Sequence, residues 1–204
     1  MLNHPITLES FAIIDRQIGS HTWTAPEYAI VRRAIHATAD FELNQLFRFQ
    51  AGAIDSGIHA LQSGCPIVVD VTMVRQGILT MLGKTFRNPV ITAVEAVAES
   101  LPGKTHTETG IMQCFTQYPN AIYVIGNAPT ALMALCAQAS KQAVPPALVI
   151  GVPVGFVQVE VSKQTLMATE FPYICVAGCK GGSPVAAAIV NALLVLAWER
   201  AQQN

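Results

Sequence analysis

Residues 121–141 read AIYVIGNAPTALMALCAQASK, and this stretch decides the fold class because it joins a buried strand to a helix through a tight turn. Its first five residues form a continuous apolar run, as expected for a strand covered on both faces of a sheet. Gly126, Asn127 and Ala128 then form the turn, and Pro129 suits the first turn of a helix predicted for residues 129–141. A strand that leads directly into a helix is the repeating unit of a parallel α/β sheet.

The same unit recurs along the chain. Further apolar runs predict strands at residues 66–71, 89–94, 147–152 and 173–177, and helical patterns are predicted at 72–77, 107–118, 162–170 and 184–200. Ahead of them, helices are predicted at residues 8–18, 25–38 and 51–63. We therefore predict an α/β fold, a flavodoxin-like three-layer α/β/α sandwich with a five-stranded parallel sheet and a helical N-terminal part. The chain is expected to form a single domain over residues 1–204, with the helical part at about 1–64 and the doubly wound part at about 65–204.

The composition limits the classes of partner. Of the 204 residues, 51% are apolar and only 12% are charged, which predicts that much surface is buried in a partner, most simply a homodimer. The formal net charge is −1, so nothing favours a nucleic-acid partner. The apolar stretches 144–157 and 185–198 fall short of the roughly 20 residues that span a bilayer, and no secretory signal is recognisable. We expect a cytoplasmic protein with free thiols at its five cysteines.

Ligands of such sheets bind at the carboxyl ends of the strands. Three glycine-rich turns follow predicted strands there, at residues 126–130, 151–155 and 178–183. These turns let a carboxylate or phosphate approach the backbone, and Lys180 adds a cation. The candidate ligand contacts are Asn127, Thr130, Lys180, Gly181 and Ser183, although Ser183 could instead cap the helix that begins near Pro184. Neither a P-loop nor a G-x-G-x-x-G motif is present, so a nucleotide- or flavin-binding domain is not favoured.

His36 is the candidate for acid catalysis. Thr24 and Glu27 form a capping box that starts the helix at residues 25–38, and His36 falls in its last turn. Unpaired carbonyl groups at a helix C-terminus favour imidazolium, and the pKa of histidine lies near neutrality, so His36 can serve as a general acid. The alternative is that it only caps the helix. Asp70, at the end of a strand, could polarise a substrate nitrogen or cap the helix predicted from Thr72.

Several segments, taken in the order in which they occur along the chain, resemble the precorrin-8X methylmutase family of cobalamin (vitamin B12) biosynthesis. They are residues 10–14 (SFAII), 33–37 (RAIHA), 64–67 (GCPI), 126–132 (GNAPTAL), 153–157 (PVGFV), 162–163 (SK), 180–183 (KGGS) and 191–193 (NAL). The resemblance implies an isomerase that moves a methyl group between neighbouring ring-C carbons of a corrin precursor. It would convert precorrin-8X to hydrogenobyrinic acid, or the cobalt-containing equivalent, without a redox cofactor or a metal of its own. His36 would then be the catalytic acid and Ser10 a substrate contact, with Arg33 and Lys180 available to the carboxylate arms of the ring.

Two positions depart from the family pattern. Arginines are usual where this chain has His106 and Cys179, so two cationic partners of the substrate carboxylates are replaced. The alternative function is a non-catalytic tetrapyrrole-binding protein, which would bind the product, leave the precursor unconverted and be indifferent to His36.

Overall fold

A six-stranded sheet organises the computed structural model, which describes residue 2 and residues 4–203. The strands are β1 (Phe47–Phe49), β2 (Ile67–Val69), β3 (Val90–Thr92), β4 (Ile122–Ile125), β5 (Leu148–Gly151) and β6 (Tyr173–Val176). The helices are α1 (Pro5–Ile18), α2 (Ala25–Thr38), α3 (Leu43–Leu46), α4 (Ala53–Gln62), α5 (Thr72–Gly83), α6 (His106–Gln117), α7 (Pro129–Ala139), α8 (Val159–Met167) and α9 (Ser183–Ala201), with a 3₁₀ turn η1 (Ala93–Glu95).

The strand order is β1-β6-β5-β4-β2-β3, and β2 to β6 run parallel. Numbered among themselves, these five strands have the flavodoxin-like order 2-1-3-4-5. The predicted five-stranded parallel sheet is therefore confirmed. The sixth strand, β1, pairs antiparallel with β6 and was not predicted, because a three-residue strand is too short to show a period.

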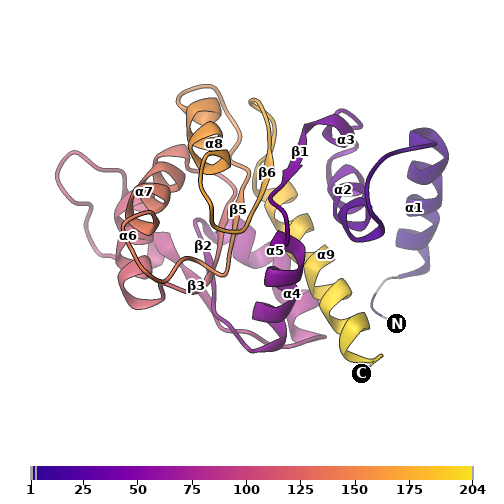
Figure 1. Ribbon diagram of the computed structural model, residues 1–204, viewed down its shortest axis with the longest axis horizontal. Helices are drawn as coiled ribbons and strands as arrows, with labels where there is room; N and C mark the ends of the chain where they lie inside the picture. Colours follow the sequence, from indigo (N-terminus) through magenta and orange to yellow (C-terminus); the bar gives the residue numbers. More distant parts are fainter. Residues whose placement is uncertain (1, 3, 204) are drawn as a thin grey trace.

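Alternate strand residues divide between two hydrophobic cores, as the pleat of a sheet requires. Val69, Val124 and Ile150 face a core shared with α1, α2, α4, α5 and α9. Val68 and Tyr123 face a second core, which is shared with α6, α7 and α8. Figure 1 shows the same three layers, with α6, α7 and α8 to the left of the strands and α4, α5 and α9 to their right. Helices α1 and α2 lie beyond α9, against which α2 packs.

Helix α9 lies at the centre of the larger core. It is the one helix in the described residues that is long and apolar enough to cross a membrane. However, it packs against α2, α4 and α5 and most of its residues are buried, so the position of α9 in the core accounts for its apolar composition.

Helix α2 keeps its predicted bounds, and most other helix ends lie within three residues of those predicted. Two of the differences, in α5 and α8, have an identifiable cause. Helix α5 continues past Gly77 to Gly83, because Gly77 packs closely on α9 rather than ending the helix: a Cβ atom there would stand 2.7 Å from the Cβ of Ala187. Helix α8 begins at Val159 instead of residue 162, after Gln158 adopts a left-handed conformation with a φ of 60°. A residue other than glycine rarely adopts this conformation, so the sequence carried no signal for it.

Candidate functional site

His36 lies in the last turn of α2, with its side chain largely open to solvent. At the start of the helix, the Glu27 carboxylate accepts hydrogen bonds from the N–H and the Oγ1 of Thr24, at 2.9 and 2.7 Å. On one side the imidazole meets the ring of Phe11 from α1 edge to face, with centroids 5.4 Å apart. This contact orients the ring of His36 while leaving its other side accessible to a ligand.

The pKa of His36 is lowered, first by partial burial and then by the positive charge of Arg33. The prediction that the helix terminus favours imidazolium is therefore wrong for this structure. One of the carbonyl groups that were expected to provide the negative charge is engaged, since Ala39 N–H donates to Ile35 O at 2.7 Å. In the preceding turn, Thr38 Oγ1 donates to Ala34 O at 3.0 Å. Neutral imidazole is thus favoured until a ligand brings negative charge.

The predicted contacts Ser10 and Arg33 lie on the pair of helices that holds His36. Ser10 is half-buried on α1, next to Phe11, and its Oγ donates to Ile6 O at 3.0 Å. Arg33 lies one turn before His36, with its guanidinium carbon 5.5 Å from the Phe11 ring centroid. Neighbouring Arg32 forms an ion pair with Asp15 at 2.9 Å, so this arginine ties α2 to α1.

Lys180 reaches the same region from the turn after β6. Its Nζ lies 2.7 Å from Asp40 Oδ2 and 2.9 Å from Glu42 Oε2, in the segment that follows α2. The next residue, Gly181, has a φ of 148°, and a Cβ atom there would stand 2.2 Å from Val152 O. Only glycine fits this close approach of two backbone segments. The cation predicted for a substrate is therefore already paired with two carboxylates of this chain.

Asn127, Thr130 and Ser183 lie at the carboxyl edge of the sheet, in the turn after β4, in the first turn of α7 and at the start of α9. Thr130 Oγ1 lies 2.9 Å from Thr105 Oγ1. Ser183 is buried, and a Cβ atom on Gly126 would stand 3.0 Å from its Cα, so the turn after β4 contacts the start of α9. Sequence reasoning placed these residues correctly at the carboxyl edge. They border the Lys180 turn through β5: Gly182 N–H donates to Val152 O, and Val152 N–H donates to Ile125 O.

Asp70 organises the turn that contains Asn127, a role that the sequence did not suggest. Its buried Oδ2 accepts hydrogen bonds from the N–H groups of Asn127 and Ala128, at 2.6 and 3.0 Å. It does not cap α5, whose N-cap residue is Val71. Burial raises the pKa of Asp70 against the opposing effect of these backbone donors. The pairing joins residues 57 positions apart, so spacing along the sequence could not reveal it.

The two departures from the family pattern have their own partners. His106 Nε2 lies 3.0 Å from Val94 O and Nδ1 lies 3.2 Å from Ser100 Oγ, so His106 fastens the segment before α6. Cys179 donates its thiol proton to Glu160 Oε1 at 3.4 Å, a contact that raises the pKa of the thiol. Both side chains are therefore engaged by other groups of this chain.

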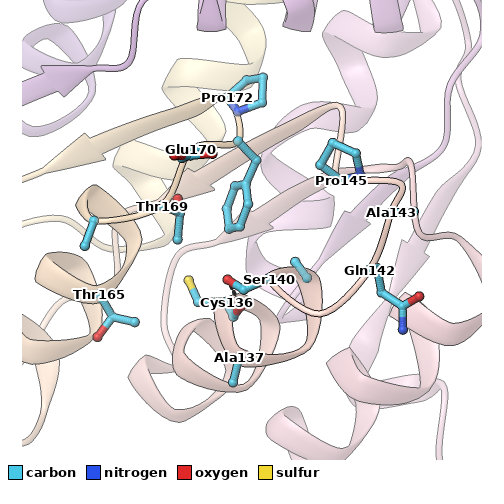
Figure 2. Close-up of a pocket in the computed structure, with 13 residues that line it drawn as sticks. Cys136, Ala137, Ser140, Gln142, Ala143, Pro145, Thr165, Thr169, Glu170 and Pro172 are labelled. Atoms are coloured by element: carbon cyan, nitrogen blue, oxygen red, sulfur yellow. Dashed lines mark hydrogen bonds between the residues drawn. The ribbon is translucent and has the colours of Figure 1, made fainter.

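A cavity of about 800 Å³ lies away from this edge. It is bounded by the C-terminal ends of α7 and α8 and by the segments that enter β5 and β6, which places it at the amino ends of the strands. Figure 2 shows Ser140, Thr169 and Glu170 at this cavity, well separated in the chain from His36. Within the described residues, no group of three His, Cys, Asp or Glu side chains could hold a metal ion.

Several apolar side chains are exposed in the turn that follows β5 and at the start of α8. Phe156 and Val157, in the turn after β5, are 95% and 81% exposed, and Val154 and Val161 are also exposed. These side chains adjoin the turn of Lys180, because Gly155 N–H donates to Cys179 O at 3.1 Å. Exposed apolar side chains next to hydrogen-bond donors suit a large apolar ligand with polar groups at its rim.

Comparison with known proteins identifies the family. The family model of CbiC, precorrin-8X methylmutase, matches residues 5–196. A cobalt-precorrin-8 methylmutase of Synechocystis sp. is 53% identical, with 97% of each chain covered. The enzyme of the same name from Leptospira interrogans is 39% identical, over 99% of this chain and 97% of the relative. The crystal structure of precorrin-8x methyl mutase from Thermus thermophilus has a TM-score of 0.89 at 40% identity, with 96% of each chain covered. The chain belongs to the precorrin-8X methylmutase family, whose members are isomerases of cobalamin biosynthesis.

Proposed function

We propose that this chain moves a methyl group between neighbouring ring-C carbons of a corrin precursor, with His36 as the general acid. The substrate is precorrin-8X or its cobalt-containing equivalent, and the product is hydrogenobyrinic acid or its cobalt form. The observation that carries the proposal is His36 itself, exposed at the end of α2 and oriented by Phe11 in a chain of this family. The alternative of a non-catalytic tetrapyrrole-binding protein has no support among the relatives, which are named as methylmutases.

The methyl shift requires the protein to donate one proton and to hold the ring in a fixed conformation. Protonation of a ring nitrogen draws electrons through the conjugated system and eases migration of the methyl group, and no redox cofactor is needed. A positioned general acid contributes about 10²–10⁴-fold to such a rate. The rest of the acceleration comes from holding one conformer and tautomer of the macrocycle.

The lowered pKa of His36 fits this role once substrate is present. Without a ligand, Arg33 and partial burial disfavour imidazolium. The carboxylate arms of a corrin precursor bring negative charge next to Arg33 and His36, which offsets the repulsion and favours protonation. The substrate therefore helps to charge the acid that acts on it, whereas the free protein keeps this side chain neutral.

Seven residues are proposed to contact the substrate: Ser10, Arg33, Asn127, Thr130, Lys180, Gly181 and Ser183. Arg33 and Lys180 would attract the carboxylate arms, and the glycine-rich turn at 181 lets the ring approach the backbone. Because Lys180 is paired with Asp40 and Glu42, a substrate carboxylate would have to share its ammonium group with these partners.

We also propose that the protein is a cytoplasmic homodimer of single-domain chains. The exposed Phe156 and Val157 support dimerisation, since a contiguous apolar surface of this kind marks an interface or a ligand site. One domain is supported by the larger core, to which both the N-terminal helices and the doubly wound part contribute.

The test is to replace His36 with alanine and with asparagine, and to follow the absorbance of the product. We expect turnover to fall by about 10²–10⁴-fold in both variants, with binding of the product retained. His59, an exposed histidine near the end of α4, provides a matched control: His59→Ala should keep the parent rate. Turnover of His36→Ala within a few-fold of the parent would refute the assigned role.

A further inference from the structure

Lys163 is a buried cation that the reaction as described does not use. It lies in α8, its side chain is 0% exposed, and its Nζ donates hydrogen bonds to Gly178 O and Lys180 O, at 2.7 and 2.5 Å. Burial lowers its pKa to about 8. A buried ammonium group destabilises a fold unless hydrogen bonds compensate for lost hydration, so a methionine would fill this space more simply. The two carbonyl groups that Lys163 binds therefore point to its role.

Both carbonyl groups belong to residues 178–182, the β6–α9 turn. Two more hydrogen bonds tie this turn to the neighbouring one: Gly182 N–H donates to Val152 O, and Gly155 N–H donates to Cys179 O. The side chain of Lys163 reaches this backbone from α8. It binds the backbone carbonyl of Lys180, whereas the side chain of Lys180 binds Asp40 and Glu42.

The side chain of Lys180 connects the turn to the helix that carries His36. Its Nζ contacts Asp40 and Glu42, four and six residues after His36. The contact with Asp40 bridges positions 140 residues apart in sequence, between the turn after β6 and the segment that follows α2. The side chain of Lys180 can span this distance only if its backbone is held at the right place, which is where Lys163 acts.

We propose that Lys163 is a positioning residue, which fixes the β6–α9 turn so that Lys180 meets Asp40 and Glu42 and thereby holds the end of α2 that carries His36. Its importance for the reaction rests on the proposed function. Its effect on the turn does not, because the contact between Lys180 and the two carboxylates can be measured without any substrate.

The first experiment joins the ion pair covalently. A water-soluble carbodiimide couples an amine to a carboxylate only where they are in direct contact, and mass spectrometry identifies the joined peptides. The parent should yield a cross-link between Lys180 and Asp40 or Glu42, and the double variant Asp40→Asn, Glu42→Gln should abolish it. Lys163→Met keeps the length of the side chain without its donors, and we expect it to lower the yield about ten-fold by reducing the effective concentration of the two groups.

Two controls separate this effect from a general loss of stability. Ser162→Ala changes the buried neighbour whose hydroxyl bonds only Val159 O inside α8, and it should keep the parent yield. Leu135→Ala opens a cavity in the core that α7 shares with α8. It should also keep the parent yield of the cross-link, although it lowers stability. A yield in Lys163→Met within two-fold of the parent would overturn the proposal.

The second experiment measures turnover of the folded fraction, well below the melting temperature of each variant. Lys163→Met should lower kcat about ten-fold, because a small misplacement of a catalytic group costs this much or more. It should also raise KM, because Lys180 and Gly181 in the same turn are proposed to contact the substrate. Leu135→Ala should retain the parent kcat. Loss of the cross-link with unchanged kcat would refute a role of Lys163 in the reaction. If the parent itself shows no methyl shift, the proposed function fails, whereas the cross-link still decides whether Lys163 positions the turn.

Discussion

At the scale of single residues, the surroundings of His36 set the pKa at which it gains a proton. Partial burial and Arg33 lower its pKa below the ordinary value of 6.5. If the acid form is required in the free enzyme, kcat/KM should be highest below this pKa and should fall as the pH rises through it. Arg33→Gln removes the repelling charge, so its pH profile should break at a higher pH than that of the parent, even though loss of a substrate contact lowers the absolute rate.

The measurement is the pH profile of kcat/KM from product absorbance, together with the titration of His36 by NMR. Arg16→Gln is the control, because Arg16 is exposed in the last turn of α1 and should leave the break in place. An unchanged break in Arg33→Gln would show that Arg33 does not set the pKa of His36.

Asp70 is expected to stabilise the turn after β4 through its two hydrogen bonds. Asp70→Ala leaves the N–H groups of Asn127 and Ala128 without their acceptor, and the bond to Ala128 is buried. An unpaired buried donor costs about 1–3 kcal/mol. Asp70→Asn retains a carbonyl oxygen as the acceptor, so urea unfolding should show a loss about half as large or less. Equal losses in the two variants would mean that packing, rather than hydrogen bonding, is what the side chain provides.

At the scale of elements, the contact between α6 and η1 requires a glycine at position 110. A Cβ atom on Gly110 would stand 2.0 Å from Ala93 O, so Gly110→Ala should force the two apart and lower the free energy of unfolding by about 3 kcal/mol. Gly83 is the matched control, at the end of α5 with no atom within 4 Å of an added Cβ. Gly83→Ala should raise the stability by about 0.5 kcal/mol. Thermal and urea unfolding test both, and equal changes would contradict the steric argument.

Sequence patterns predicted those elements whose signals are local. Helix α2 has the predicted bounds, because the capping box of Thr24 and Glu27 marks its start directly. The five parallel strands were found because strands covered on both faces are continuous apolar runs. Strand β1 was missed because its pairing with β6 is a tertiary contact, and the start of α8 was missed because it depends on the rare conformation of Gln158.

The candidate site was predictable in its position and less so in its electrostatics. Glycine-rich turns after apolar runs located the carboxyl edge, and the helix pattern located His36. The pKa of His36, the partners of Lys180 and the hydrogen bonds of Asp70 depend on residues brought together only by the fold. No spacing rule reports contacts of that kind.

For the whole molecule, the exposed apolar turn after β5 predicts self-association. The double variant Phe156→Asp, Val157→Asp places two charges on side chains that are 95% and 81% exposed, so it should leave the fold intact and turn a dimer into a monomer. Val144→Asp, an exposed apolar position near the amino ends of the strands, should remain dimeric. Sedimentation velocity distinguishes the two species, and a parent that sediments as a monomer would contradict the prediction.

The central place of α9 has a consequence for biosynthesis. Helices α2, α4 and α5 leave the ribosome well before the helix that they enclose, and their apolar faces have nothing to cover them until α9 arrives. Such a nascent chain is prone to aggregate and a natural client for a chaperone. Native assembly then waits on contacts between distant parts of the chain, which makes refolding in vitro slow.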